Sequence, residues 1–159
     1  MNTIELNQAL YCLPHFVGTF PCDSIPLVAL RPCSYVINLD GSEERGSHWV
    51  SLFVDQFNNA TYFDSYGQPP PDGNDICDIL PCFTSNPLIF NNKILQSIES
   101  DVCGYYCALF IILFGNGVPL VKIQSLFSDD FKLNDRLVKK LVQNYIVRVL
   151  EQSHANHLL

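Results

Sequence analysis

QSIESDVCGYYCALFIILF, residues 96–114, is the stretch of sequence that decides the fold of this chain. Its polar half ends at Asp101, an unbroken apolar run follows from Ala108, and a Gly-Asn-Gly turn at residues 115–117 closes it. This punctuation predicts one buried helix, with Ser100 or Asp101 as its N-cap and Gly115 as its C-cap. We expect the rest of the chain to be organised around this helix.

Cys103 falls in the first turn of the predicted helix. The free N–H groups and the positive end of the helix dipole stabilise a thiolate there and lower the pKa of the cysteine. Cys107 lies one helical turn further along, so both thiols can point the same way. We interpret Cys103 as a nucleophile and Cys107 as a structural residue.

Length and composition predict one globular domain over residues 1–159. Hydrophobic residues make up 48% of the chain and charged residues 16%, which indicates a packed protein rather than a disordered one. The apolar run 108–114 is too short to span a membrane, and residues 1–5 lack the basic start of a signal peptide. We therefore expect a soluble protein made in the cytosol, with no membrane partner.

Charge and cysteine content argue against several other classes of protein. The net charge is −7 and the nine Lys and Arg residues are spread along the chain, so nucleic-acid binding is not expected. The seven cysteines form no Cys-x-x-Cys pair and no zinc-ligand spacing, so neither a disulfide scaffold nor a metal site is predicted. Most of them are interpreted as small buried hydrophobic residues.

The remaining segments alternate between short helices and β-rich runs. Two such runs, 48–55 and 61–67, are joined by Asn58-Asn59, which predicts a hairpin in an antiparallel meander. The predicted elements are helices at 2–13, 76–80, 121–127 and 134–152, strands at 34–39, 48–55, 61–67 and 88–95, an irregular segment at 14–23, and a frayed tail at 153–159. The expected core face of the last helix consists of Leu137, Leu141, Tyr145 and Val149.

A cysteine nucleophile needs a general base within hydrogen-bond reach and a group that orients this base. His48 opens a strand, and Asp64 lies 16 residues later in the next strand, where a carboxylate can fix the imidazole tautomer. A simple hairpin register about Asn58-Asn59 places His48 opposite residue 69, so a bulge, a strong twist or a skewed register is needed to join the two side chains. Asp72 is the rival orienter by the same arithmetic.

Gln96, seven residues before Cys103, offers a neutral amide donor. Together with the backbone N–H of Cys103 it is positioned to form an oxyanion hole for a tetrahedral intermediate. As an isolated glutamine it would be an ordinary surface residue. It is assigned this role only because it precedes Cys103 in the sequence.

The order His48-Trp49, Tyr-Phe-Asp-Ser-Tyr-Gly at 62–67, Gln96, and Asp-x-Cys-Gly-x-x-Cys at 101–107 resembles the adenovirus endopeptidase (adenain) and the SUMO-deconjugating cysteine proteases. The similarity is greatest to the adenain-like proteases of Polinton/Maverick elements and related DNA viruses, and covers residues 16–114. It implies an α+β fold with a papain-like core. In that fold, a central helix carrying the nucleophile packs on a mostly antiparallel sheet, with flanking helices.

Residue by residue, the resemblance implies Cys103 as nucleophile, His48 as general base, Asp64 as its orienter in preference to Asp72, and Gln96 in the oxyanion hole. Trp49 would shape a narrow channel that admits small residues such as glycine near the scissile bond.

The implied function is a cysteine endopeptidase that cleaves viral or element-encoded capsid or polyprotein precursors at Gly-containing sites. One alternative is a deconjugating protease for a SUMO- or ubiquitin-like modifier, and a second is a non-catalytic interaction module. We expect no cofactor. An activating peptide, as in adenain, is not indicated, and activation by DNA is not expected at a net charge of −7. We expect a monomer in a reducing intracellular setting, the host cytoplasm or nucleus, or packaged in a virion.

Overall fold

The computed structural model describes residues 1–156, and the side chains of residues 1–152. It confirms the α+β class, with one five-stranded sheet and helices on both of its faces. The elements, in chain order, are α1 (Thr3–Leu10), β1 (Phe16–Pro21), a 3-10 turn (Cys22–Ser24), β2 (Cys33–Asn38), β3 (Trp49–Val54), β4 (Ala60–Phe63), α2 (Asp75–Phe83), β5 (Ile89–Phe90), α3 (Cys103–Gly115), α4 (Leu120–Gln124) and α5 (Phe131–Asn156).

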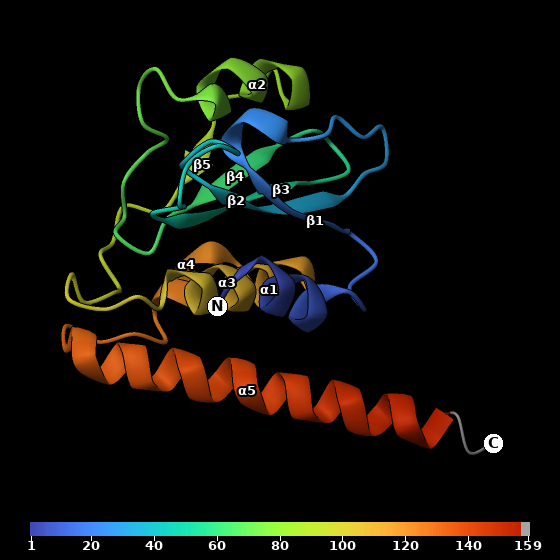
Figure 1. Ribbon diagram of the computed structural model, residues 1–159, viewed down its shortest axis with the longest axis vertical. Coiled ribbons are helices and arrows are strands. Elements are labelled where there is room, and N and C mark those ends of the chain that lie inside the picture. The colour runs from blue at the N-terminus through green and yellow to red at the C-terminus, as the bar shows by residue number, and fades with distance from the viewer. Residues whose placement is uncertain (157–159) are drawn as a thin grey trace.

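The sheet separates two hydrophobic cores (Figure 1). On one face, α3 packs against the sheet, with α1 beside it and α5 covering its outer side. On the other face, α2 closes a second core around Tyr35, Leu52 and Tyr62. Because α3 lies between the sheet and α5, it is apolar all round, as its sequence predicts.

The sheet has the strand order β1-β2-β3-β4-β5. Its centre, β2-β3-β4, is antiparallel, while β1 and β5 run parallel to their neighbours at the two edges. The prediction of an irregular segment over 14–23 is wrong for residues 16–21, which form β1. Gly18 and Pro21 lowered the strand signal, but an edge strand tolerates both residues because one of its sides needs no partner.

The β3-β4 hairpin has a different register from the one expected about Asn58-Asn59. Its ladder pairs Val54 with Ala60 and Ser51 with Phe63, and the same register continued places His48 opposite residue 66. The loop closes on Asp55, whose carboxylate accepts hydrogen bonds from the backbone N–H groups of residues 57 and 59 at 2.8 Å each. Asp64 is therefore the diagonal neighbour of His48 on the same face, and no bulge is needed.

The helix α3 forms where the apolar run predicts it, but its caps differ from those expected. Val102 occupies the N-cap position and makes no side-chain capping bond, so neither Ser100 nor Asp101 caps the helix. At the other end the C-cap is Asn116. Gly117, at φ +84°, follows in a Schellman turn, with its N–H bonded to the Phe114 carbonyl.

The flanking elements agree with their predicted type and differ in length. The first helix ends at Leu10, and Asn2 caps it in a capping box with Glu5. The expected edge strand over 88–95 shrinks to Ile89–Phe90. The helix α5 continues to Asn156, so the predicted fraying is wrong for residues 153–156, and residues 157–159 lie outside the described part.

The predicted core face of α5 is present but is centred on other residues. Val138 and Val142 are fully buried, while Leu137, Leu141 and Tyr145 pack at the margin of the core. Within residues 1–156, none of the helices combines the length and the apolar character needed to cross a bilayer.

Candidate active site

A cleft of about 490 Å³ lies where the start of β3 meets the start of α3. Four of the five predicted site residues line it, namely His48, Trp49, Gln96 and Cys103. The fifth, Asp64, lies behind His48 and is hydrogen-bonded to it. The fold thus brings together residues that are spread over more than fifty positions in the sequence.

The imidazole of His48 is held by the Asp64 carboxylate. Its Nε2 lies 2.7 Å from Asp64 Oδ1, and the two side chains are only 13% and 5% exposed. The same carboxylate oxygen accepts a hydrogen bond from the backbone N–H of Tyr66 at 2.8 Å. Since Nε2 is engaged by Asp64, Nδ1 is the nitrogen that remains for the thiol. Asp72, the rival orienter, lies on the exposed loop before α2 and does not pair with His48.

Asn91 fixes the backbone of Asp64, and the sequence analysis did not identify it. Its Oδ1 accepts from the N–H of Asp64 at 2.8 Å, and its Nδ2 donates to the carbonyl of Asp64 at 2.6 Å. Asn91 is itself buried directly after β5. A single asparagine 27 residues away carries no pattern that would reveal this role, which depends on the pairing of β4 with β5.

Cys103 is buried, with 7% of the residue exposed, and lies at the first position of α3. Burial raises the pKa of this thiol, but hydrogen bonding to His48 and to the backbone N–H groups of Trp49 and Gly104 outweighs it, so the pKa is lowered. The N-terminal position adds to the effect, because the free N–H groups of the first turn stabilise negative charge.

The pKa of His48 moves in the opposite direction. Burial lowers it, but the Asp64 carboxylate and the Cys103 sulfur outweigh the burial and raise the pKa of His48 to about 9. The lowered pKa of the thiol and the raised pKa of the imidazole both favour the thiolate and imidazolium forms of this pair. That is the reactive state of a cysteine nucleophile.

Gln96 is buried, with its amide at the edge of the cleft. Ser65 Oγ donates to Gln96 Oε1 at 2.7 Å, which fixes the amide so that its NH₂ group faces the other side. Nε2 donates to the Ser100 carbonyl at 2.8 Å and to the Tyr66 hydroxyl at 3.2 Å. The bond to the Tyr66 hydroxyl is the longer of the two, and both of its partners line the cleft.

Tyr66 is a further site residue for which the sequence analysis gave no role, although it stands in the quoted motif Tyr-Phe-Asp-Ser-Tyr-Gly. Its ring lies over the imidazole of His48, with the centroids 4.9 Å apart and the planes tilted by 31°. It therefore joins the base, through its ring, to the Gln96 amide, through its hydroxyl.

Trp49 forms a wall of the cleft beside the thiol. Its Nε1 donates to the carbonyl of Met1 at 3.1 Å, which fixes the indole against the start of the chain. Gly104 permits this approach, because a Cβ there would lie 3.4 Å from Trp49 Cδ1 and 3.1 Å from Met1 Cβ. Met1 and Trp49 therefore form one part of the wall of the cleft that also contains Cys103.

The other thiols and the other described histidine lack this environment. Cys107 is fully buried, and burial raises its pKa well above the ordinary value, in agreement with the expected structural role. His15 is buried against Gly115 and hydrogen-bonds Ser34 Oγ at 2.9 Å. Over the part of the chain that the structure describes, no group of His, Cys, Asp and Glu is arranged to hold a metal ion.

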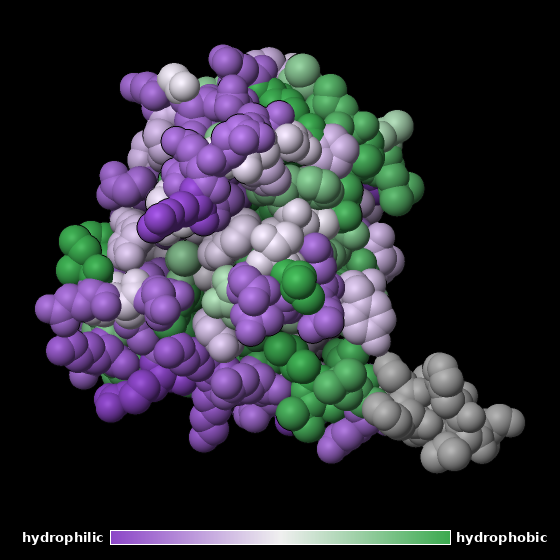
Figure 2. Space-filling view, in the orientation of Figure 1, coloured by the Kyte–Doolittle hydropathy of each residue, from purple (hydrophilic) through white to green (hydrophobic). Residues whose placement is uncertain are grey.

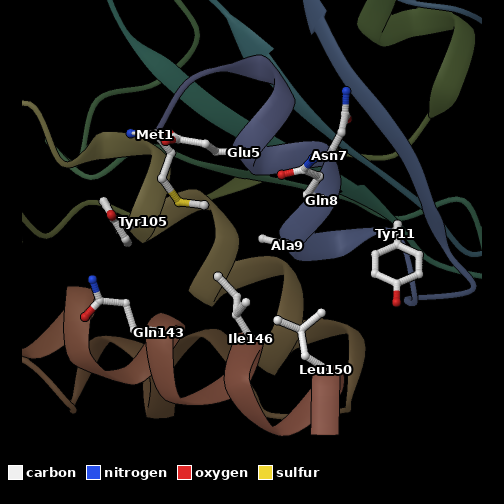
Figure 3. A pocket seen from close by; sticks show the side chains of 10 residues that line it. All are labelled: Met1, Glu5, Asn7, Gln8, Ala9, Tyr11, Tyr105, Gln143, Ile146 and Leu150. Carbon is white, nitrogen blue, oxygen red and sulfur yellow. Dashed lines mark ion pairs between the residues drawn. The ribbon is translucent and has the colours of Figure 1, made fainter. Parts of the chain in front are cut away.

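A larger hollow of about 790 Å³ lies between α1, the start of α3 and α5 (Figure 3). The side chains of Ile146 and Leu150 point from α5 toward Ala9 of α1. Neither a thiol nor an imidazole is among the ten residues that line it, and Glu5 is their one carboxylate. The larger hollow is therefore not the candidate active site. The smaller cleft is the candidate, because its lining includes the thiol of Cys103 and the imidazole of His48.

Comparison with known proteins found a viral relative. No protein-family profile matches the chain. The chain is 29% identical over 153 residues to "Putative thiol protease R355" of Acanthamoeba polyphaga mimivirus, covering 79% of this chain and 51% of that protein. The chain thus spans about half the length of this curated relative. This relative confirms the resemblance to viral thiol proteases that the motifs indicated.

Among solved structures, the chain is similar to the ASFV pS273R protease, determined as a selenomethionine crystal structure. The match has 24% sequence identity and a TM-score of 0.47, and covers 68% of this chain and 44% of that chain.

Proposed function

We propose that this chain is a cysteine endopeptidase in which Cys103 is the nucleophile, His48 the acid and base, and Asp64 the orienter. One observation carries the proposal. The imidazole of His48 is hydrogen-bonded to Asp64 at 2.7 Å. The pKa of His48 is raised and that of Cys103 is lowered, and both shifts favour the thiolate and imidazolium forms. The mimivirus relative named as a thiol protease supports the same reaction class.

In the first half of the reaction, the Cys103 thiolate attacks the carbonyl carbon of the scissile bond. A carbon–sulfur bond forms as the carbonyl electron pair moves onto oxygen. The His48 imidazolium then donates its proton to the amine nitrogen as the carbon–nitrogen bond breaks, which leaves a thioester on Cys103 and a neutral imidazole.

In the second half, neutral His48 accepts a proton from water while the water oxygen attacks the thioester. The carboxylic acid product leaves, and thiolate and imidazolium are restored. Asp64 holds the imidazole in one orientation through its hydrogen bond to Nε2. No metal or organic cofactor takes part in this scheme, since the side chains supply both the nucleophile and the proton transfers.

The oxyanion of each tetrahedral intermediate is stabilised by donors at the start of α3. One is the backbone N–H of Cys103, which belongs to the first turn of α3, where N–H groups have no acceptor within the helix. The other is an Nε2–H of Gln96, which in this structure donates to the neutral Tyr66 hydroxyl at 3.2 Å. In the reaction the oxyanion replaces this hydroxyl as the acceptor. A charged acceptor makes the stronger hydrogen bond, so the exchange favours the intermediate.

The substrates are polypeptides with small residues at the scissile bond. Support comes from Trp49, a large side chain fixed against Met1 in the wall of the cleft that contains the thiol, where a residue without a bulky side chain fits best. We propose that they are viral or element-encoded precursors of capsid or polyprotein type. The reaction needs a reduced thiol, and all seven cysteines are free, which suits a reducing intracellular compartment or a virion assembled there.

The test is cleavage of a peptide with an internal Gly-Gly-X site beside a SUMO or ubiquitin fusion, with Cys103→Ala as the control protein. We expect the peptide to be cut by the wild type and not by the control. Cleavage of the fusion alone would replace the proposal by the deconjugating alternative. If neither is cut and an electrophilic probe ending in Gly-Gly fails to label Cys103, the non-catalytic module is the correct description.

A further inference from the structure

The segment that carries Gln96 is held by side chains from two helices. The carbonyl of Leu95, directly before Gln96, accepts a hydrogen bond from the Tyr106 hydroxyl of α3 at 3.0 Å. The backbone N–H of Ser97, directly after Gln96, donates to Asp135 Oδ1 of α5 at 3.4 Å. The loop that leads into α3 thus lies beside the start of α5 (Figure 1), and Gln96 is fixed through both of its neighbours.

Tyr106 joins these two contacts. Its hydroxyl also lies 3.0 Å from Asp135 Oδ1, so its one proton serves both the Leu95 carbonyl and the carboxylate. Burial raises the pKa of Tyr106 and the Asp135 carboxylate raises it further, so the hydroxyl keeps this proton and remains a donor. Asn134 Nδ2 donates to the same Leu95 carbonyl at 3.0 Å, which engages the second lone pair of that oxygen. We call the side chains of Tyr106, Asn134 and Asp135 the helix clamp.

The polar groups of the helix clamp are buried. Tyr106 and Asn134 are each 1% exposed, and Asp135 is 8% exposed. The other charged side chains in the first turns of α5 are exposed, and the surface over this part of the helix is hydrophilic in Figure 2. Burial of an amide and a carboxylate is unfavourable unless each finds hydrogen-bond partners, and here those partners include the backbone groups on either side of Gln96.

The helix clamp also connects the two proposed oxyanion donors. Tyr106 lies three residues after Cys103 on α3, so its bond to Leu95 ties the residue before Gln96 to the helix that supplies the Cys103 N–H. The backbone N–H of Gln96 adds a bond to the Ser65 carbonyl at 3.2 Å. Because a misplacement of about 1 Å can cost on the order of 10² in rate, the relative position of the two donors matters for the reaction.

We propose that Tyr106 and Asp135 are positioning residues of the reaction, which hold the Gln96 amide in place relative to the Cys103 N–H in the oxyanion hole. The inference rests on the proposed peptidase function. Neither Tyr106 nor Asp135 is among the residues that line the cleft, so both act through the backbone of residues 95–97 and not by contact with the substrate. This role extends the site to α5, beyond the segment 16–114 that carries the motifs.

The proposed role separates two reactions of the same thiol. Peptide hydrolysis passes through a tetrahedral intermediate whose oxyanion needs both donors. In alkylation by iodoacetamide, the Cys103 thiolate displaces iodide from a saturated carbon, and no oxyanion forms. A variant that loses only the helix clamp should therefore have a lower kcat for the Gly-Gly-X peptide and keep the wild-type rate and pH profile of Cys103 alkylation.

Tyr106→Phe removes the hydroxyl and keeps the ring in the core. We expect kcat to fall on the order of tenfold with little change in KM, which is less than the roughly 10²–10³ loss expected for Gln96→Ala. Asp135→Asn keeps an acceptor oxygen for Tyr106 and Ser97, and should retain most of the activity that Asp135→Ala loses. Tyr35→Phe makes the same chemical change in the core on the other face of the sheet, and should leave kcat unchanged.

The most specific comparison introduces Tyr106→Phe into Gln96→Ala. No further loss of kcat is expected there, because the side chain that Tyr106 positions is absent. Three outcomes overturn the inference and leave the reaction intact: Tyr106→Phe cleaves as fast as the wild type, it lowers kcat by the same factor with and without the Gln96 side chain, or it changes Cys103 alkylation as much as cleavage. Absence of cleavage by the wild type overturns the reaction and the inference together.

Discussion

Replacing Asp64 by asparagine removes the carboxylate that keeps His48 protonated. The pKa of His48 is about 9 because the pairing with Asp64 and Cys103 outweighs burial. In Asp64→Asn the burial remains and the carboxylate is gone, so this pKa should fall toward the ordinary value of 6.5. At pH 8 the imidazolium fraction would then fall from about 0.9 to about 0.03, roughly 30-fold.

The same substitution changes the pH at which the Cys103 thiolate forms. His48 above its ordinary pKa is positively charged from low pH up to about pH 9, and the Cys103 thiolate depends on that charge. In Asp64→Asn the imidazole loses its proton at lower pH, so the thiolate should form at higher pH. The assay is the rate of iodoacetamide alkylation of Cys103 from pH 5 to about 10, followed by mass spectrometry of the labelled peptide.

Asp72→Asn is the matched control, because it makes the same chemical change on the exposed loop before α2. It should leave the pH profile of Cys103 alkylation unchanged. The reasoning is refuted if the Asp64→Asn profile coincides with the wild-type profile, or if Asp72→Asn shifts it by as much.

Three further predictions concern the thiols, the oxyanion donor and the anchor of Asp64. Cys103→Ala should abolish cleavage of the Gly-Gly-X peptide, whereas Cys107→Ala should retain it; the reverse pattern would show that the wrong thiol was chosen. Gln96→Ala should lower kcat for that peptide by roughly 10²–10³ with little change in KM, and a change confined to KM would contradict the oxyanion role. Asn91→Ala should lower the free energy of unfolding by about 1–3 kcal/mol in a urea titration, because two backbone groups of Asp64 lose their partner; an unchanged midpoint would show that water replaces both bonds.

The central helix and the residues at the cleft could be predicted because their signals are local. The apolar run 108–114 and the Gly-Asn-Gly turn after it require a buried helix of this length and place Cys103 at its start. The motif around His48 and Asp64 lies on two strands that are adjacent in sequence, which predicts a hairpin, and the resemblance to adenain-like proteases favoured Asp64 over Asp72.

What could not be predicted depends on individual contacts between distant segments. The hairpin register is set by Asp55, whose carboxylate bonds select a loop of a different length from Asn58-Asn59 alone. The strand β1 becomes visible only through its parallel pairing with β2, since Gly18 and Pro21 interrupt its strand-forming residues. Asn91 acquires its role through a backbone contact with Asp64 that no local pattern encodes.

The N-cap of α3 illustrates a further limit of local patterns. Ser100 and Asp101 are favourable capping residues, yet the helix begins at Cys103 with Val102 in the N-cap position, and no side chain caps it. The carbonyl of Ser100 instead accepts a hydrogen bond from the Gln96 amide. This bond holds Gln96, the proposed oxyanion donor, in its position. A departure from the best local choice occurs here at the proposed reaction centre, where uncapped N–H groups serve the chemistry.

The most direct test of the account is a competitive alkylation of the native protein by limiting iodoacetamide near pH 7, with the modified cysteines identified by mass spectrometry. Exposure alone ranks Cys12 and Cys82 first, because both are exposed while Cys103 is 7% exposed. The account predicts that Cys103 is labelled fastest, because its thiolate is stabilised by His48 and by the start of α3. Faster labelling of Cys12 or Cys82 than of Cys103 would contradict the claim that Cys103 is an activated nucleophile.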